Sequence, residues 1–323
     1  MMRTKRLGRT KLQLPIVGIG TAFVGVPTQN DTVVEVDDER RRLDEALGLQ
    51  TLVTAIDAGC TFIDTAVLYG RSMSESMIGE ALRQRPAAKD SIIVTTKAGR
   101  SHLGYDFSFD GILRSVEQSL ERLGLDRLKI VYIHDAMGQP MDELLSARGA
   151  LGALRQLQSQ GIIEHIGTAC NNPPTNLEYI RTGEFDAAVI ADCWSLINHI
   201  AAREIFAAAA EHDVGLVGAT PLERSLLVTG PQADTKYLNR IFTPDCLAHV
   251  GKIQQLCARY DAPMLAVALQ WCTRHPQVAS VIPGARVPEE ARTSLAAAEL
   301  DIPAQLWAEL DPMLRHFDSA IDV

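Results

Sequence analysis

Four polar residues sit near the ends of apolar, strand-like segments and could together move a proton. Asp64 and Lys97 each close such a segment, and His134 closes the next one along the chain. Tyr69 lies in the loop that leaves the Asp64 segment. An acid, a phenol, an ammonium and an imidazole are the groups that acid–base catalysis uses.

These residue types suit the interconversion of a carbonyl and an alcohol. A tyrosine has a pKa of about 10 and is a poor acid or base near neutrality. A neighbouring ammonium favours the phenolate, so Lys97 is expected to lower the pKa of Tyr69. Asp64 would pair with Lys97 and keep it charged. His134 would hydrogen-bond the oxygen of the carbonyl or alcohol and orient it.

Each residue taken alone also has a plainer interpretation. Asp64 could cap a helix, Lys97 could be a solvated strand end, and Tyr69 could be a packing residue. The pair His134-Asp135 could be a satisfied core pair or the start of a metal site in a hydrolase barrel. Four such residues at successive strand ends favour the joint catalytic interpretation.

The elements that would position these residues alternate regularly. Helix-like segments are expected over 38–59, 74–85, 109–124 and 141–161. Eight segments rich in Val and Ile show little polar alternation, as expected of parallel strands buried on both faces: 16–23, 61–66, 91–99, 128–136, 163–169, 186–194, 214–220 and 278–284.

This order predicts an α/β fold of the (β/α)8 TIM barrel type, in one domain over 1–323. A short N-terminal β-hairpin around 8–10 precedes the barrel, and a C-terminal helix follows it. The carboxyl ends of all strands in such a barrel converge on one face. A doubly wound sheet is the alternative. It would carry a GxGxxG turn after the first strand, and VGIGTAFVG lacks that spacing.

Composition limits the function further. The 323 residues carry a formal net charge of -9, which argues against a nucleic-acid partner. The six cysteines form no CxxC pair and are read as buried thiols of a reducing compartment. The basic N-terminus lacks the apolar stretch of a secretory signal, and no run approaches the roughly 20 apolar residues of a membrane span. We therefore expect a soluble cytoplasmic protein.

The chain resembles the aldo-keto reductase family over nearly its whole length. FIDTAVLYGRSMSESMIGEAL resembles the family's signature at the second strand, VTTKAG supplies its lysine, and VYIHD its histidine. The resemblance implies that Tyr69 is the general acid/base and that Lys97 and Asp64 tune it. It implies that His134 orients the substrate.

The family binds a nicotinamide cofactor across the barrel mouth without a Rossmann unit. By resemblance, Asn171 in IGTACNN would hold the carboxamide and Trp194 in ADCWSL would stack on the nicotinamide. Ala191 stands where the family has a glutamine. ATPLERSLL resembles the loop over the pyrophosphate, but Glu223 and Ser225 replace its glycines.

VIPGARVPEEARTSLAAAEL resembles the adenosine-binding segment, with Glu290 in place of a common glutamine and Ser294 in place of a common asparagine. A carboxylate there could accept a bond from a ribose 2′-hydroxyl but would repel a 2′-phosphate. This favours NAD over NADP, although Arg286 favours the reverse. No metal is expected. The resemblance implies a cofactor site of Gly20, Thr21, Asp64, Asn171, Trp194, Thr220, Pro221, Leu222, Arg224, Pro283, Gly284, Arg286, Glu290 and Ser294.

Within the family the chain is most similar to bacterial aldose 1-dehydrogenases of the fucose and arabinose type, with pyridoxal dehydrogenase nearby. Such enzymes oxidise a ring hemiacetal to a lactone. We therefore expect NAD(P)-dependent oxidation of an aldose or similar cyclic hemiacetal. His102, Tyr105 and Phe107 would line the substrate site, or else pack in an exposed loop.

Three other functions stay open. The same residues could act mainly as an NADPH-dependent aldehyde or ketone reductase. The fold also serves as a cofactor-sensing accessory subunit of channels, although the intact set of four argues against that role. A metal-dependent hydrolase would need further His and carboxylate ligands at the strand ends. The expected partner is a small-molecule substrate, with no membrane, and the oligomeric state is left open.

Overall fold

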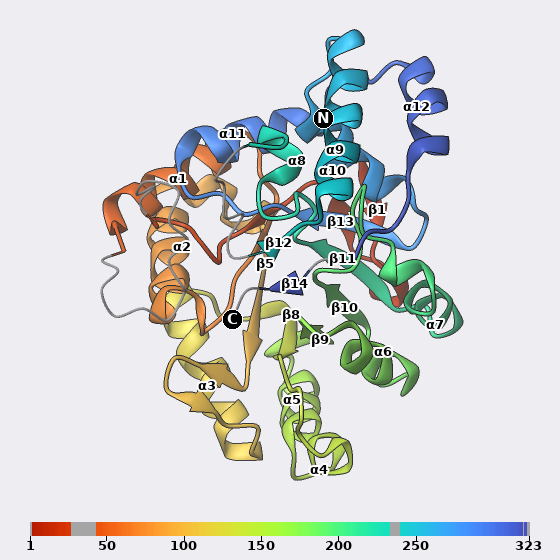
Figure 1. The fold of residues 1–323 in the computed structure, drawn as a ribbon. Helices are drawn as coiled ribbons and strands as arrows, with labels where there is room; N and C mark the ends of the chain where they lie inside the picture. Colours follow the sequence, from red (N-terminus) through yellow and green to blue (C-terminus); the bar gives the residue numbers. More distant parts are fainter. Residues whose placement is uncertain (1, 27–42, 233–239, 319, 322–323) are drawn as a thin grey trace.

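The structure is a computed structural model that describes residues 2–26, 43–232, 240–318 and 320–321. Eight parallel strands form one sheet in the order in which they follow along the chain. Isolated parallel bridges from Val17 to Val281 and from Gly20 to Gly284 join its two edges. The sheet thus closes into a (β/α)8 barrel, which confirms the predicted fold (Figure 1). Its strands are β3 (Ile19–Gly20), β4 (Phe62–Asp64), β5 (Ile93–Ala98), β8 (Leu128–His134), β9 (Ile163–Cys170), β10 (Ala187–Ile190), β11 (Gly215–Ala219) and β13 (Val278–Ile282).

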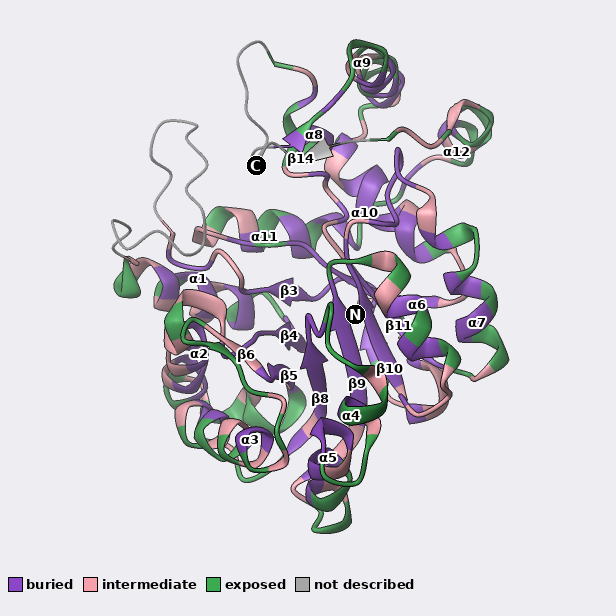
Figure 2. Cartoon of the chain, turned by 60° about the horizontal axis from the view of Figure 1, so that its bottom comes forward, coloured by how far each residue is buried: buried purple, intermediate pink, exposed green. Residues whose placement is uncertain are grey.

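Helices surround the sheet and turn their buried faces toward it (Figure 2). Polar caps fix several helix starts, as in Asp44 accepting from the Leu47 amide at 2.9 Å and Ser108 from the Gly111 amide at 3.1 Å. The longer helices are α1 (Glu45–Asp57), α2 (Met73–Gln84), α3 (Phe109–Leu123), α5 (Ala150–Ser159), α6 (Pro173–Arg181), α7 (Ile205–Glu211), α9 (Pro244–Arg259), α10 (Met264–Arg274), α11 (Pro288–Ala297) and α12 (Ala304–Leu310).

The predicted helices agree with the structure except in two places. Residues 38–42 of the first predicted helix lie outside the described residues. The helix predicted over 141–161 is wrong, because the chain forms a short α4 (Met141–Leu145) and then α5. A Cβ at Gly149 would lie 2.0 Å from the carbonyl oxygen of Glu143, so this glycine lets the chain fold back closely on α4.

The N-terminal hairpin is confirmed and covers one end of the barrel. Strands β1 (Thr4–Arg6) and β2 (Gln13–Pro15) pair antiparallel. Leu7 and Leu14 are fully buried in the same cluster as Phe62, inside the barrel. The Arg9 amide donates to the carbonyl oxygen of Asp213 at 2.7 Å, just before β11 begins. The hairpin therefore covers the amino-terminal ends of the strands.

Two small antiparallel two-stranded sheets add to the barrel sheet. The first follows β5 and consists of β6 (Arg100–Ser101) and β7 (Gly104–Tyr105). The second pairs β12 (Arg240–Ile241) with β14 (Ala320–Ile321), beyond the expected C-terminal helix α12. Both are extra to the alternating pattern, and the first lies directly after Lys97.

Candidate active site

Asp64 and Lys97 form a buried ion pair between neighbouring strands. The Lys97 ammonium donates to a carboxylate oxygen of Asp64, and it also donates to the carbonyl oxygen of Thr65 at 2.8 Å. The second carboxylate oxygen of Asp64 accepts from the Thr95 hydroxyl at 3.0 Å. Both charged side chains are 2% exposed. Such a pair persists inside a protein only when hydrogen bonds satisfy its remaining polar atoms, as they do here.

Tyr69 reaches this pair from a tight turn. Gly70, Arg71 and Ser72 all have left-handed backbone angles, with φ of 56°, 54° and 74°. Such conformations are costly for residues other than glycine and concentrate at functional sites. The turn places the Tyr69 ring with its centroid 4.7 Å from the Lys97 nitrogen. The phenol therefore lies beside an ammonium, as the sequence predicted.

His134 lies next to Tyr69 at the end of β8. The two ring centroids are 5.8 Å apart and the rings are nearly perpendicular. Burial lowers the pKa of His134 well below its ordinary value, and the charges of Lys97 and Arg100 lower it further. His134 is therefore neutral. Its Nδ1 atom is buried and has no hydrogen-bond partner within the described part of the chain.

The net direction of the Tyr69 pKa shift differs from the expectation. Burial raises the pKa of Tyr69 and the charge of Lys97 lowers it, with the net direction upward. Lys97 therefore lowers the pKa as expected, but the net shift is upward because desolvation of the phenolate outweighs the effect of the ammonium. Desolvation also lowers the pKa of Lys97, but Asp64 and Tyr69 raise it to above its ordinary value. Lys97 remains an ammonium.

The Ser-Glu dipeptide after Tyr69 supports the site from outside. The Ser74 hydroxyl donates to Thr21 Oγ1 at 2.7 Å and lies 2.9 Å from Thr65 Oγ1. Glu75 is fully buried, accepts from the Thr96 hydroxyl at 2.5 Å and pairs with Arg122. These two residues hold in place the segments around the tetrad, which consists of Asp64, Tyr69, Lys97 and His134. The side chains of Ser74 and Glu75 themselves are used within the fold.

Apart from Asp64 and Trp194, the expected cofactor residues come from other strands than the catalytic four. The tetrad comes from the region of β4, β5 and β8, whereas the cofactor residues follow β9, β11, β13 and β3. Asn171 follows β9 and is exposed. Gly20 donates its amide to the carbonyl oxygen of Pro283 at 2.9 Å, and Gly284 beside it is exposed.

Several non-glycine residues in the loop after β11 have left-handed backbone angles. Two of them, Glu223 and Ser225, stand where the family has glycines. Thr220, Glu223, Arg224 and Ser225 have φ of 58°, 45°, 53° and 76°. The buried side chain of Glu223 accepts from the hydroxyl of Ser195 at 2.6 Å, which anchors the strained turn. Pro221 is buried and Leu222 is half-buried in the same turn. The non-glycine residues of this loop thus adopt the left-handed backbone that glycine favours.

Arg224 in this loop is held by a carboxylate. Its guanidinium lies 3.1 Å from Asp192 Oδ2 and is partly exposed. Arg240 also reaches Asp192, at 3.0 Å, and lies 3.4 Å from Glu223. Two cations thus share two acids at this edge of the mouth. Arg224 is oriented by Asp192 and still faces solvent in part.

Trp194 does not lie where the resemblance placed it. Its ring stacks on Trp271 with the centroids 4.5 Å apart and meets the edge of Phe206 at 4.7 Å. Its indole nitrogen donates to the carbonyl oxygen of Cys272 at 3.0 Å. Trp194 therefore packs against α7 and α10 in the outer layer, and the structure does not support its stacking on a nicotinamide. The four residues after β10 carry the ring outward.

Arg286 and Glu290 pair at the start of α11. The guanidinium donates to a carboxylate oxygen of Glu290 at 3.0 Å, and the Arg286 amide donates to the other oxygen at 2.7 Å. Both side chains are about one-third exposed. Ser294, in contrast, is 2% exposed, and the hydroxyl of Thr21 is used within the fold, where it donates to the carbonyl oxygen of Asp64. The expected side-chain contacts of Ser294 and Thr21 with a cofactor are not supported.

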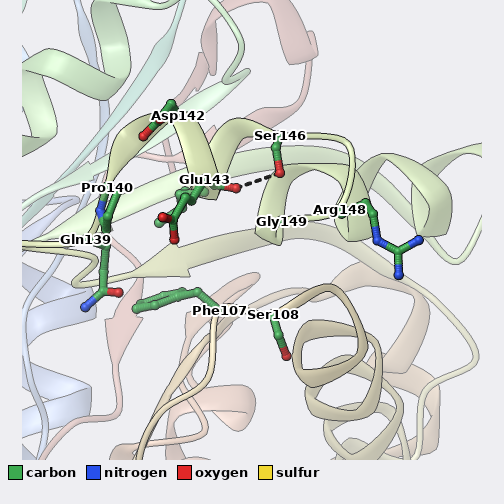
Figure 3. A pocket seen from close by; sticks show the side chains of 10 residues that line it. Phe107, Ser108, Gln139, Pro140, Asp142, Glu143, Ser146, Arg148 and Gly149 are labelled. Carbon is green, nitrogen blue, oxygen red and sulfur yellow. Dashed lines mark hydrogen bonds between the residues drawn. The ribbon is translucent and has the colours of Figure 1, made fainter.

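The three residues expected near the substrate surround the β6–β7 hairpin. His102 and Tyr105 are exposed, and the Tyr105 ring stacks on Phe107 with centroids 5.9 Å apart. Phe107 also lines a cavity of about 510 Å³, where its ring lies toward Gln139 and Glu143 (Figure 3). None of the four tetrad residues lines this cavity. The cavity is therefore distinct from the candidate site.

Two further observations concern metals and membranes. Across residues 2–26, 43–232 and 240–318, no three His, Cys, Asp or Glu side chains are arranged to hold a metal ion. In the same ranges, no helix is long and apolar enough to cross a membrane. All six cysteines are buried and free.

Comparison with known proteins identifies the family. A model of the aldo/keto reductase family matches residues 33–315. The chain belongs to this family. It is accordingly an oxidoreductase that depends on a nicotinamide cofactor. D-threo-aldose 1-dehydrogenase from a Pseudomonas species is 31% identical, covering 93% of this chain and 94% of the relative.

Two further comparisons agree with this assignment. Pyridoxal 4-dehydrogenase from Microbacterium luteolum is 24% identical over 95% of this chain and 96% of its own length. Among solved structures, an aldo-keto reductase from Bacillus halodurans in its holo form superposes with a TM-score of 0.78 at 23% identity. The match covers 98% of this chain and 97% of the other. This last comparison supports the fold alone.

Proposed function

We propose that this aldo/keto reductase oxidises an aldose or a similar cyclic hemiacetal to the corresponding lactone. The observation that carries the proposal is the contact of the Tyr69 ring with the buried Asp64–Lys97 pair, beside a neutral His134. The similarity to D-threo-aldose 1-dehydrogenase and pyridoxal 4-dehydrogenase supports the proposal. Aldoses, which the first relative is named for, form cyclic hemiacetals.

The four residues have separate roles in this proposal. The Tyr69 phenolate takes the proton of the substrate hydroxyl, and the protonated phenol returns it in the reverse direction. Lys97 lowers the cost of the phenolate, and Asp64 holds Lys97 in place and charged. His134 hydrogen-bonds the substrate oxygen, since its neutral ring offers one donor and one acceptor nitrogen. The nicotinamide, when bound, supplies the hydride acceptor or donor.

The residues present fit such a cofactor. Asn171 offers an exposed amide for the carboxamide, Arg224 a partly exposed cation for the pyrophosphate, and Gly284 an open approach beside β13. Glu290 would accept a bond from a ribose 2′-hydroxyl and repel a 2′-phosphate. Because Glu290 also engages Arg286, we favour NAD over NADP.

The test is nicotinamide absorbance with purified protein, NAD or NADP, and a panel of aldoses together with pyridoxal. We expect reduction of NAD with at least one cyclic hemiacetal. Oxidation of NADPH by simple aldehydes, without any signal from the panel, would instead show a reductase. Tight cofactor binding without turnover on any substrate would point to a sensing subunit.

A further inference from the structure

Asp135 is a buried carboxylate that the roles above leave unused. It follows His134 directly, is 2% exposed and has a left-handed backbone with φ of 47°. A strained, buried acid at the mouth needs partners to persist. Asp135 has them on two sides: the Arg100 guanidinium, and both the backbone and the side chain of Asn171.

The contacts with Asn171 are specific in direction. The backbone N–H of Asn171 donates to Asp135 Oδ1 at 2.8 Å. The side-chain nitrogen Nδ2 of Asn171 donates to Asp135 Oδ2 at 3.4 Å. An ionised carboxylate can only accept hydrogen bonds. Asp135 is paired with Arg100, so it can bind the NH₂ end of Asn171 but not the oxygen end. The side-chain oxygen of the exposed Asn171 is left for a ligand.

We propose that Asp135 is a positioning residue that fixes Asn171 as a hydrogen-bond acceptor for the NH₂ of a primary carboxamide. This inference rests on the proposed function, in which that carboxamide belongs to the nicotinamide. Without Asp135, the side-chain amide of Asn171 could rotate by half a turn and present either its NH₂ group or its oxygen to the ligand. With Asp135, the site prefers a ligand that donates.

Arg100 extends the arrangement toward the substrate side. It lies on β6, and its guanidinium is 5.6 Å from the centroid of the Tyr105 ring. The Arg100 side chain is 24% exposed, whereas its partner Asp135 is buried. The hairpin expected to line the substrate site is thus tied, through one carboxylate, to the residue expected to hold the nicotinamide.

The experiment compares two dinucleotides that differ only at the carboxamide. The 3-acetylpyridine analogue of NAD, or of NADP, carries a methyl group in place of the NH₂ and cannot donate. Isothermal titration calorimetry gives the dissociation constant of each dinucleotide with its analogue. We expect the wild-type protein to prefer the carboxamide by about 3- to 10-fold, the range of one net hydrogen bond. Asp135→Asn and Asn171→Ala should each bring the ratio close to one.

Glu75→Gln is the matched control. Glu75 is equally buried and pairs with an arginine of similar exposure, Arg122 at 22%, but it lies away from Asn171. A general loss of stability would therefore affect both variants, whereas the ratio should change only in Asp135→Asn. If Asp135→Asn does not fold, Arg100→Met replaces it, because the carboxylate then loses the cation that fixes Oδ2.

The possible results distinguish failure of the Asp135 inference from failure of the proposed function. A wild-type preference that Asp135→Asn abolishes and Glu75→Gln retains supports the inference. A wild-type ratio of one, or a preference that the Asp135 or Arg100 variant retains, overturns it while the proposed function stands. Failure of the wild-type protein to bind any of the four dinucleotides would overturn the proposed function and this inference together.

Discussion

Lys97 on β5 donates a hydrogen bond to Asp64 on the neighbouring strand β4, and both side chains are almost completely buried. Two charges taken out of water cost free energy that only their mutual contact and further hydrogen bonds offset. A barrel that served only as a scaffold would fill this position with apolar side chains. The buried pair is therefore better explained by the phenol that it contacts, Tyr69.

Removing one member of this pair should destabilise the protein. Asp64→Asn leaves the Lys97 ammonium buried without its counter-charge, and we expect a loss of about 3 to 5 kcal/mol in the free energy of unfolding. Denaturant titration followed by circular dichroism measures this loss. Asp57→Asn is the control, since it breaks an exposed pair with Arg85 and should change stability little. Equal losses in the two variants would contradict the account.

Tyr69→Phe should remove turnover and leave cofactor binding nearly unchanged. The substitution deletes only the hydroxyl that exchanges the proton, so we expect kcat to fall by about 100-fold to 10,000-fold. Steady-state kinetics and calorimetric titration of the cofactor measure the two effects. Tyr260→Phe, just after α9, removes only a hydroxyl that contacts Glu309, so it is the matched control and should keep kcat. A Tyr69→Phe enzyme with most of its activity would disprove the proton-transfer role.

Oxidation should become faster as the pH rises. The phenolate of Tyr69 is the base, and its burial raises the pKa above the ordinary value, so the phenolate fraction grows across the alkaline range. Reduction needs the protonated phenol and should not show this rise. Because the pKa of His134 is lowered well below its usual range, His134 should add no inflection near neutrality. A profile of kcat/KM for oxidation that is flat from pH 6 to about 10 would exclude a titrating phenol.

Cofactor preference should depend on one carboxylate at the start of α11. Glu290→Gln removes a charge that would repel a 2′-phosphate and frees Arg286 to bind it. We expect affinity for NADP to rise by roughly tenfold while affinity for NAD falls slightly. Glu289→Gln is the control, because the neighbouring acid pairs with Arg292 instead. If both variants change NADP affinity alike, a general charge effect explains it and not the Arg286–Glu290 pair.

The barrel and the grouping of the tetrad could be predicted from the sequence for a simple reason. Parallel strands buried on both faces read as apolar runs, and the polar residues that end them must converge at one face. Asp64, Lys97 and His134 each close such a run. Tyr69 follows β4 in a loop, next to a left-handed turn at 70–72, so its place beside Lys97 depends on a loop conformation that strand order does not determine.

The structure differs from the sequence-based expectations where the orientation or burial of a side chain depends on the fold around it. Trp194 lies four residues beyond β10, far enough for the ring to turn outward onto Trp271. The sign of the Tyr69 pKa shift depends on how deeply the phenol is buried, which no motif reports. The sequence indicates Asp135 only as part of a His134-Asp135 pair, either a core pair or the start of a metal site. The contact of Asp135 with Asn171 depends on the neighbouring positions of β8 and β9.

The central claim is that hydride passes directly from the carbinol carbon of a cyclic hemiacetal to the nicotinamide. The most direct measurement uses an aldose deuterated at that carbon and mass spectrometry of the reduced cofactor and the sugar product. The account predicts deuterium in the reduced cofactor and a lactone without it. Unlabelled reduced cofactor, or deuterium released to water, would contradict it.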